Sequence, residues 1–321
     1  MAVPVGTSPD PRGGGGHLVW KRTAVHGRPA LYGVAGSGLP VLFLHGWALG
    51  QHSYRRALKR LALLGCQVFA PALPGFGGTA DLPAAQFSFA GYADWVDGFL
   101  DAVGIDEPVL LIGHSFGGGV AITLADELPS RVRHLVLVNS VGGSAWSATR
   151  SMADRPLWDW GVRFPSDVFP LGQLTRLLPV VLEDAVPNAV RNPRALWRVA
   201  QLARKADLTP QLQHLRERRL PVLVLWGDKD QIIPRASFDA LCEALGSEGS
   251  VVTGSHSWLL ADPDAFAAAL GGVVAATRQA REQEAIDAHP LGRLRRGRGR
   301  SEPRFRLPRL RPVAPPLDRG R

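Results

Sequence analysis

The apolar run Val109-Leu110-Leu111-Ile112 leads into Gly113-His114-Ser115-Phe116-Gly117, and a second apolar run of helix-compatible residues follows. A strand that turns sharply into a helix strains the residue at the turn, and only small neighbours leave room for it. Gly113 and Gly117 supply this room. The turn lifts the Ser115 hydroxyl to the carboxyl end of a sheet and to the start of a helix, whose amides favour negative charge. The stretch predicts a strand, a turn that presents a nucleophilic serine, and a helix.

Apolar runs and helical segments alternate along the rest of the chain. A hairpin is expected at 17–25 and 30–34, and buried strands at 41–44, 67–70, 134–139, 221–226 and 250–253. Helical spacing lies between them, at 54–64, 87–103, 208–218, 236–245 and 262–287. Such alternation is typical of an α/β fold, whose mostly parallel twisted sheet carries helices on both faces.

One gap in this alternation is too long for a single crossover helix. It separates the strands at 134–139 and 221–226, and it is rich in tryptophan and phenylalanine. We expect an inserted helical cap at 144–207, between the two parts of a core domain at 17–143 and 208–288. A single aromatic residue is more often part of the packing than a ligand contact. As a group they are candidates for a substrate cavity, with Trp146, Trp158 and, outside the insert, Trp258 as the residues to examine.

The excess positive charge lies in one segment at the end of the chain. The protein has a formal net charge of +9, and residues 289–321 contain eleven arginines and only two acidic residues. The remaining sequence is formally neutral, so a nucleic-acid interface is not expected on the folded part. This Arg- and Pro-rich tail is expected to be disordered. Either it contacts anionic surfaces, or it is a solvated extension without a dedicated partner.

Cysteine usage and the first residues favour the cytoplasm. Cys66 and Cys242 share no motif spacing and lie in or beside apolar segments, so we expect buried free thiols. Residues 1–16 contain four consecutive glycines and no apolar signal-peptide core, which predicts a disordered leader. Apolar stretches such as 265–276 are too short for a transmembrane segment of about 20 residues.

A serine hydroxyl needs a base within hydrogen-bond reach and an acid that orients this base. His256 follows the last expected strand, and Asp228 and Asp230 follow the strand before it. Ligand and catalytic residues of open α/β sheets collect at the carboxyl ends of strands. The chain order serine, aspartate, histidine is also the one associated with this type of turn. Either aspartate is a candidate acid, and the other is then a turn residue.

A tetrahedral oxyanion on the substrate requires hydrogen-bond donors that are already in place. One is the backbone N–H of Phe116, the residue after the nucleophile. The second is expected from the loop after the strand at 41–44, and the backbone N–H of Trp47 is the candidate. His45, in the same loop, is expected to shape the loop rather than to act as the base. His114 is expected to point away from Ser115 and to be structural.

Five motifs together resemble the α/β-hydrolase fold superfamily, in its cap-bearing serine hydrolase branch. The resemblance covers about residues 18–285. Its motifs are His45-Gly46-Trp47, Pro74-Gly75-Phe76-Gly77, Gly113-His114-Ser115-Phe116-Gly117-Gly118, Gly227-x-x-Asp230-x-x-x-Pro234, and His256 with Asp262-Pro263. The resemblance selects Asp230 as the acid. It implies a catalytic triad of Ser115, Asp230 and His256 and an oxyanion hole at Trp47 and Phe116.

The resemblance also implies a small-molecule substrate and no metal or organic cofactor. Serine at position 115 disfavours the dehalogenase and epoxide hydrolase branches, which carry aspartate there. Serine members include esterases, lipases, C–C bond hydrolases, peptidases and perhydrolases. We expect hydrolysis of an ester or related acyl bond in a small to medium, largely apolar substrate. The alternatives are one of the other serine-dependent activities, or a non-catalytic ligand-binding protein on the same scaffold.

Overall fold

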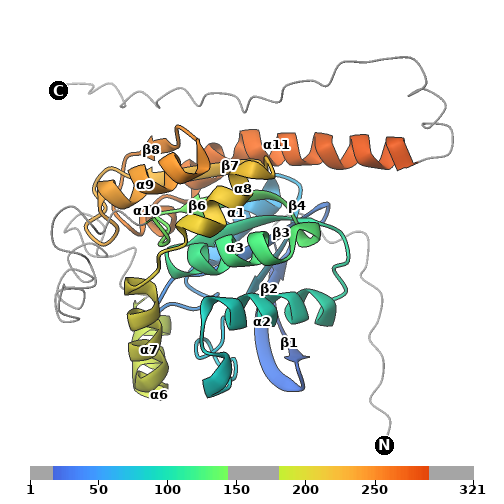
Figure 1. The fold of residues 1–321 in the computed structure, drawn as a ribbon. Coiled ribbons are helices and arrows are strands. Elements are labelled where there is room, and N and C mark those ends of the chain that lie inside the picture. The colour runs from blue at the N-terminus through green and yellow to red at the C-terminus, as the bar shows by residue number, and fades with distance from the viewer. Residues whose placement is uncertain (1–16, 144–180, 289–321) are drawn as a thin grey trace, which may run out of the picture.

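Eight strands form one sheet in the order β1-β2-β4-β3-β5-β6-β7-β8 in the computed structural model, which describes residues 17–143 and 181–288 (Figure 1). β1 and β2 pair antiparallel with each other, and β2 pairs antiparallel with β4, while all other neighbours are parallel. The α/β fold and the opening hairpin are therefore confirmed. The strands are β1 (Leu18–Val25), β2 (Arg28–Ala35), β3 (Leu39–Leu44), β4 (Cys66–Pro71), β5 (Val109–His114), β6 (Val132–Val138), β7 (Val222–Gly227) and β8 (Ser250–Val252).

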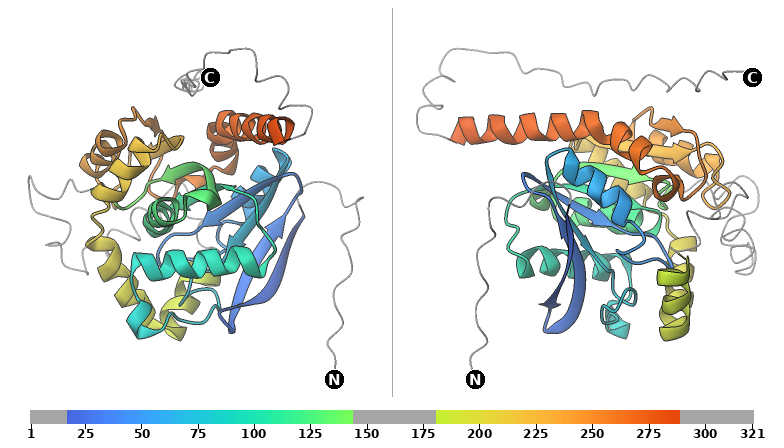
Figure 2. Two further views of the ribbon diagram at one scale, coloured as in Figure 1. Left: turned by 45° about the vertical axis from the view of Figure 1, so that its right-hand side comes forward. Right: turned by 180° about the vertical axis from the view of Figure 1, so that it is seen from behind.

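Helices cover both faces of the sheet (Figure 2). On one face the core contains residues of α1, α10 and α11, and on the other it contains residues of α2, α3, α8 and α9. Their bounds are α1 (Arg55–Leu63), α2 (Phe89–Ala102), α3 (Phe116–Glu127), α8 (Thr209–Glu217), α9 (Arg235–Leu245), α10 (Trp258–Ala261) and α11 (Pro263–Ala288), with short 3₁₀ turns at Ala84–Gln86 and Pro129–Arg131. The helices expected from the sequence lie within a few residues of these bounds.

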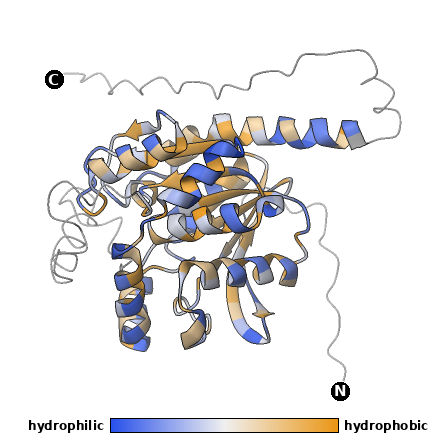
Figure 3. Ribbon diagram, viewed as in Figure 1, coloured by the Kyte–Doolittle hydropathy of each residue, from blue (hydrophilic) through white to orange (hydrophobic). Residues whose placement is uncertain are grey.

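The central strands are apolar along their whole length because helices cover both of their faces. Every residue of β3 and of β5 is buried, and the sheet is coloured mainly as hydrophobic in Figure 3. Each fully buried valine, leucine or isoleucine contributes about 1.5–3 kcal/mol. Cys66 and Cys242 are both free and buried, as predicted.

The strand order places a switch point between β3 and β5. The chain passes from β3 to β4 on one side, and β5 then pairs with β3 on the other side. Loops at the carboxyl ends of two such strands leave the sheet in opposite directions and open a crevice, where ligands of α/β proteins bind. Residues 45–54, after β3, and Ser115, after β5, both lie at this point.

A helical segment precedes α8 and falls within the insert expected at 144–207. It comprises a π-helix (Val181–Ala185), α6 (Val186–Arg191) and α7 (Pro193–Arg204). Trp146 and Trp158, the leader and the tail lie outside the described residues. Within residues 17–143 and 181–288, no helix combines the length and hydropathy needed to cross a bilayer.

Candidate active site

Ser115 stands on a strained turn between β5 and α3. Its φ and ψ angles are 54° and −117°, a backbone conformation that non-glycine residues rarely adopt. Both flanking residues must be glycine, because there is no space for a Cβ atom at either position. A Cβ atom on Gly113 would lie 2.5 Å from the Gly117 carbonyl oxygen, and one on Gly117 would lie 2.4 Å from the Leu44 carbonyl oxygen. The turn therefore packs directly against the end of β3.

His256 and Asp230 form a buried hydrogen-bonded pair. The His256 Nδ1 atom lies 2.8 Å from Asp230 Oδ2, and the side chains are 6% and 0% exposed. Asp230 Oδ1 accepts hydrogen bonds from the backbone N–H groups of Ile232 and Ile233, at 2.8 Å each. These donors stabilise the carboxylate, which in turn accepts the Nδ1 proton of His256. The neutral imidazole then has an unprotonated Nε2, as a general base requires.

The two candidate aspartates differ in their contacts. Asp228 is exposed, and its Oδ1 accepts a hydrogen bond from the backbone N–H of Gly254, at 2.9 Å. Asp228 therefore ties the loop after β7 to the loop after β8, whereas Asp230 carries the contact with His256. This geometry agrees with the choice of Asp230 made on the motif.

Asn139 and Trp258 continue the hydrogen-bonded chain behind Asp230. The Asn139 side-chain amide donates to Asp230 Oδ2 at 2.5 Å, and Asn139 Oδ1 accepts the Trp258 indole N–H at 2.8 Å. The Trp258 ring also packs against Phe266 in the core, with ring centroids 5.9 Å apart. Trp258, a candidate substrate contact, is thus buried and hydrogen-bonded behind Asp230, and it is not among the described residues that line the cavity below.

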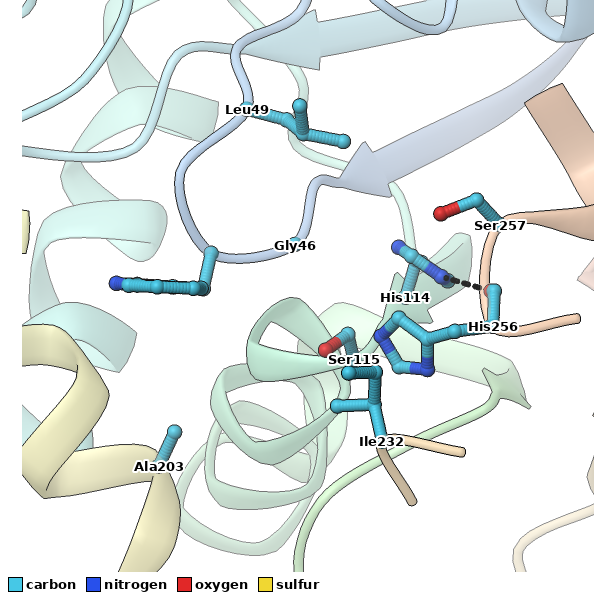
Figure 4. Close-up of a pocket in the computed structure, with 9 residues that line it drawn as sticks. Gly46, Leu49, His114, Ser115, Ala203, Ile232, His256 and Ser257 are labelled. Atoms are coloured by element: carbon cyan, nitrogen blue, oxygen red, sulfur yellow. Dashed lines mark hydrogen bonds between the residues drawn. The ribbon is translucent and has the colours of Figure 1, made fainter. Parts of the chain in front are cut away.

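Ser115 and His256 lie beside each other in a small cavity (Figure 4). The cavity has a volume of about 20 Å³ and a mostly apolar lining. Its walls come from the loop after β3, the serine turn, the loops after β7 and β8, and α7. The lining residues are Gly46, Trp47, Leu49, His114, Ser115, Ala203, Ile232, His256 and Ser257. Five parts of the chain that are distant in sequence therefore meet around the Ser115 side chain.

The loop after β3 passes close to the nucleophile. A Cβ atom on Gly46 would lie 3.2 Å from Ser115 Cβ and 2.9 Å from His114 Nδ1. The next residue, Trp47, lines the cavity, and its indole N–H donates to the Leu196 carbonyl at 2.7 Å. Phe116, the residue after Ser115, begins α3.

Two further buried histidines hold these loops in place. His45 Nε2 accepts the Leu73 backbone N–H at 2.8 Å, so the ring proton is on Nδ1, which donates to the Gly46 carbonyl. His114 lies beside Ser115, but its Nδ1 accepts from the Tyr54 hydroxyl at 2.8 Å and its Nε2 donates to the His256 carbonyl at 3.0 Å. Both nitrogens of each ring are therefore hydrogen-bonded, and the two histidines connect neighbouring loops of the site.

Burial keeps both of these rings neutral. Desolvation lowers the pKa of His45 to about 4 and lowers the pKa of His114 well below its ordinary value, with the His256 charge adding to the effect. The Tyr54 hydroxyl, whose pKa is raised by burial, also accepts the Gly46 backbone N–H at 3.1 Å. Tyr54 thereby links the loop after β3 to the serine turn.

Sequence reasoning missed Asn139 and Tyr54. Asn139 follows the β6 strand, so the same rule about carboxyl ends that selected Asp230 and His256 points to it. Tyr54 lies in a stretch with helical spacing and carries no comparable signal. Among the described residues, no group of three or more histidine, cysteine, aspartate or glutamate side chains could hold a metal ion.

Comparison with known proteins covers most of the chain. Residues 41–269 match the family described as "Alpha/beta hydrolase family". A pimeloyl-[acyl-carrier protein] methyl ester esterase of Neisseria meningitidis is 32% identical over 244 residues, which cover 71% of this chain and 90% of that protein. A putative non-heme haloperoxidase of Mycobacterium phage D29 is 28% identical, over 71% of this chain and 85% of that protein.

A solved structure extends the similarity to the fold. A putative lipase of Acinetobacter baumannii superimposes with a TM-score of 0.67 and 20% identity, over 82% of this chain and 92% of that one. At this identity the superposition supports the fold alone. The family model matches more than half of the chain, which shows that the chain belongs to the alpha/beta hydrolase family of enzymes.

Proposed function

We propose that this protein is a serine hydrolase that cleaves an ester or related acyl bond through an acyl-enzyme on Ser115. The observation that carries the proposal is the contact of 2.8 Å between His256 and Asp230, made beside a serine on a strained turn. Residues 144–207, whose α7 contributes Ala203 to the cavity lining, are proposed to form a cap over the site. The apolar lining favours a largely apolar substrate, which we propose to be of small to medium size.

In this mechanism Ser115 Oγ attacks the substrate carbonyl carbon while His256 Nε2 takes the hydroxyl proton. Asp230 holds the ring in the correct tautomer and stabilises the imidazolium that forms. The tetrahedral oxyanion accepts hydrogen bonds from the backbone N–H groups of Trp47 and Phe116. The C–O bond to the alcohol then breaks, and His256 returns its proton to the leaving oxygen. Water repeats the sequence on the acyl-enzyme and releases the acid.

Two other classes of function are alternatives to this proposal. C–C bond hydrolysis, peptide hydrolysis and perhydrolysis use the same triad and differ in the bond that is attacked. A non-catalytic ligand-binding protein keeps the fold without turnover. The buried donors to Asp230 favour catalysis over mere binding, because they hold a charged carboxylate in position behind the histidine.

Turnover of p-nitrophenyl acetate and butyrate tests the proposal. The wild-type protein should hydrolyse both and react with a fluorophosphonate probe, and Ser115→Ala should lose both activities. Ser257→Ala, which removes another serine from the same cavity, is the matched control and should keep the labelling. Turnover that survives Ser115→Ala would overturn the proposal. A panel of ester, lactone, peptide and C–C substrates then ranks the bond types by kcat/KM.

A further inference from the structure

The loop that supplies the proposed oxyanion donor is held in place by residues far from it in the sequence. It joins β3 to α1 through residues 45–54, and a Cβ atom on its Gly46 would lie 3.2 Å from Ser115 Cβ. A displacement of this loop therefore moves the Trp47 N–H relative to the attacking oxygen. The residues that fix the loop decide how well the donor is placed before the reaction starts.

Asp184 holds the second half of this loop. Its carboxylate is buried, and Oδ2 accepts hydrogen bonds from the Gly50 N–H at 3.2 Å, the Ser53 N–H at 2.8 Å and the Ser53 hydroxyl at 2.5 Å. A buried carboxylate needs such donors to offset the loss of water. Hydrogen bonds to a charged acceptor are also stronger than those between neutral groups. The carboxylate and the loop therefore stabilise each other.

Asn188 holds the first half of the loop through Ala48, the residue after Trp47. Ala48 has a φ of 64°, in the left-handed region that side chains other than glycine avoid. Its carbonyl accepts a hydrogen bond from the Asn188 side-chain amide at 3.1 Å, and Asn188 Oδ1 accepts the Gly77 N–H at 3.0 Å. Strained backbone of this kind persists only where its surroundings fix it.

All of these contacts come from one segment, residues 181–196, which also provides the Leu196 carbonyl for the Trp47 indole N–H. We infer that Asp184 and Asn188 are positioning residues that fix the oxyanion loop, so that the segment 181–196 sets the placement of the Trp47 donor. Neither residue lines the cavity within the described part of the chain. They act through the loop and not on the substrate. The inference rests on the proposed function.

Kinetics of Asp184→Asn and Asp184→Ala test the inference. Loss of one oxyanion donor lowers kcat by about 10²–10³-fold, so a misplaced donor should cost about 10–100-fold. The loss should fall on kcat, with KM changed less than about threefold, and Asp184→Asn should lose less than Asp184→Ala because it keeps one acceptor oxygen. Glu183→Gln is the matched control: the adjacent carboxylate is exposed and pairs with Arg55 on α1. It should retain wild-type kcat.

A second measurement separates donor placement from general loosening of the fold. A boronic acid inhibitor that forms a tetrahedral adduct on Ser115 should bind Asp184→Asn more weakly by the same factor as the fall in kcat/KM. The intrinsic fluorescence of each variant and the midpoint of its urea denaturation show whether a fraction of the protein has unfolded. A folded Asp184→Asn with wild-type kcat, or with a change in KM alone, would overturn the inference. If Ser115→Ala also keeps full activity, the proposed function fails as well.

Discussion

The two sides of the proposed catalytic cavity are held in different ways. On the side of the proposed triad (the triad side), Ser115, Asp230 and His256 lie one, three and four residues after strands of one sheet. Asp230 is held there by two backbone N–H groups of its own loop and by Asn139, which follows the neighbouring strand β6. On the oxyanion side, the loop after β3 is fixed by a segment 131 to 149 residues further along the chain. The sheet therefore positions the proposed nucleophile, while an element outside the sheet holds the loop of the proposed donor.

This difference indicates how one scaffold accommodates several reactions. A nucleophile built on buried, apolar strands keeps its geometry as long as the core folds. A donor loop tied to a surface segment changes when that segment changes. Substitutions should therefore separate into those that stop the chemistry and those that weaken it.

Asp230→Asn should give the largest effect on the triad side. The amide no longer accepts the Nδ1 proton of His256, so the histidine adopts the wrong tautomer, and kcat should fall by about 10⁴-fold. Asp228→Asn, which changes the exposed aspartate two residues earlier, should keep kcat within twofold. Equal losses in the two variants, measured with p-nitrophenyl butyrate, would contradict the assignment of the acid.

Gly117→Ala should disrupt the contact between the two sides. The added Cβ would lie 2.4 Å from the Leu44 carbonyl oxygen and 2.6 Å from that of His45, and neither backbone atom can move away without shifting β3. We expect the free energy of unfolding in urea to fall by about 3 kcal/mol. Gly271→Ala in α11 is the control, because its Cβ would meet no atom within 4 Å. It should be neutral or stabilising by up to about 1 kcal/mol.

Asn139→Ala should weaken the triad side without stopping it. The variant loses the hydrogen bond to Asp230 and leaves the buried Trp258 indole N–H without its acceptor. We expect kcat/KM for p-nitrophenyl butyrate to fall about tenfold, mainly through kcat. An unchanged kcat in a folded variant would show that the backbone donors alone are enough to hold Asp230.

His134 should make the fold sensitive to acid independently of either side of the cavity. It is buried in β6, both ring nitrogens lack a hydrogen-bond partner among the described residues, and desolvation lowers its pKa to about 4. Between about pH 6.5 and pH 4, the His134 ring therefore binds a proton in the unfolded chain, where its pKa is near 6.5, but stays neutral in the folded protein. Stability from the neutral ring is complete above about pH 6.5 and is lost as the pH falls towards 4.

The corresponding measurement is urea denaturation of wild type and His134→Leu at pH 7.5 and pH 5. The loss of stability on acidification should be about 1–2 kcal/mol smaller in the variant. Ester hydrolysis at pH 7.5 should be unchanged. An equal loss in both proteins would assign the acid sensitivity to other groups, such as His45.

The strands and most helices could be predicted from the sequence because their apolar spacing is local. The positions of Ser115 and His256 after strands of the sheet could be predicted in the same way, whereas the choice of Asp230 over Asp228 needed the family resemblance. The support for the loop after β3 could not be predicted, because Asp184 and Asn188 lie in a segment with no motif and contact residues more than a hundred positions earlier. Composition also does not tell a tryptophan in the core from one in a cavity, and Trp258 is buried with its indole N–H bonded to Asn139.

The hydrogen bonds between residues 46–53 and 181–196 also bear on how this protein can be recombined with its relatives. A chimera that takes either stretch from another hydrolase breaks these bonds at the junction, however well its own helices fold. Exchange of both stretches together preserves them. Crossover points for altering substrate range are therefore best chosen so that the two stretches are inherited as a pair.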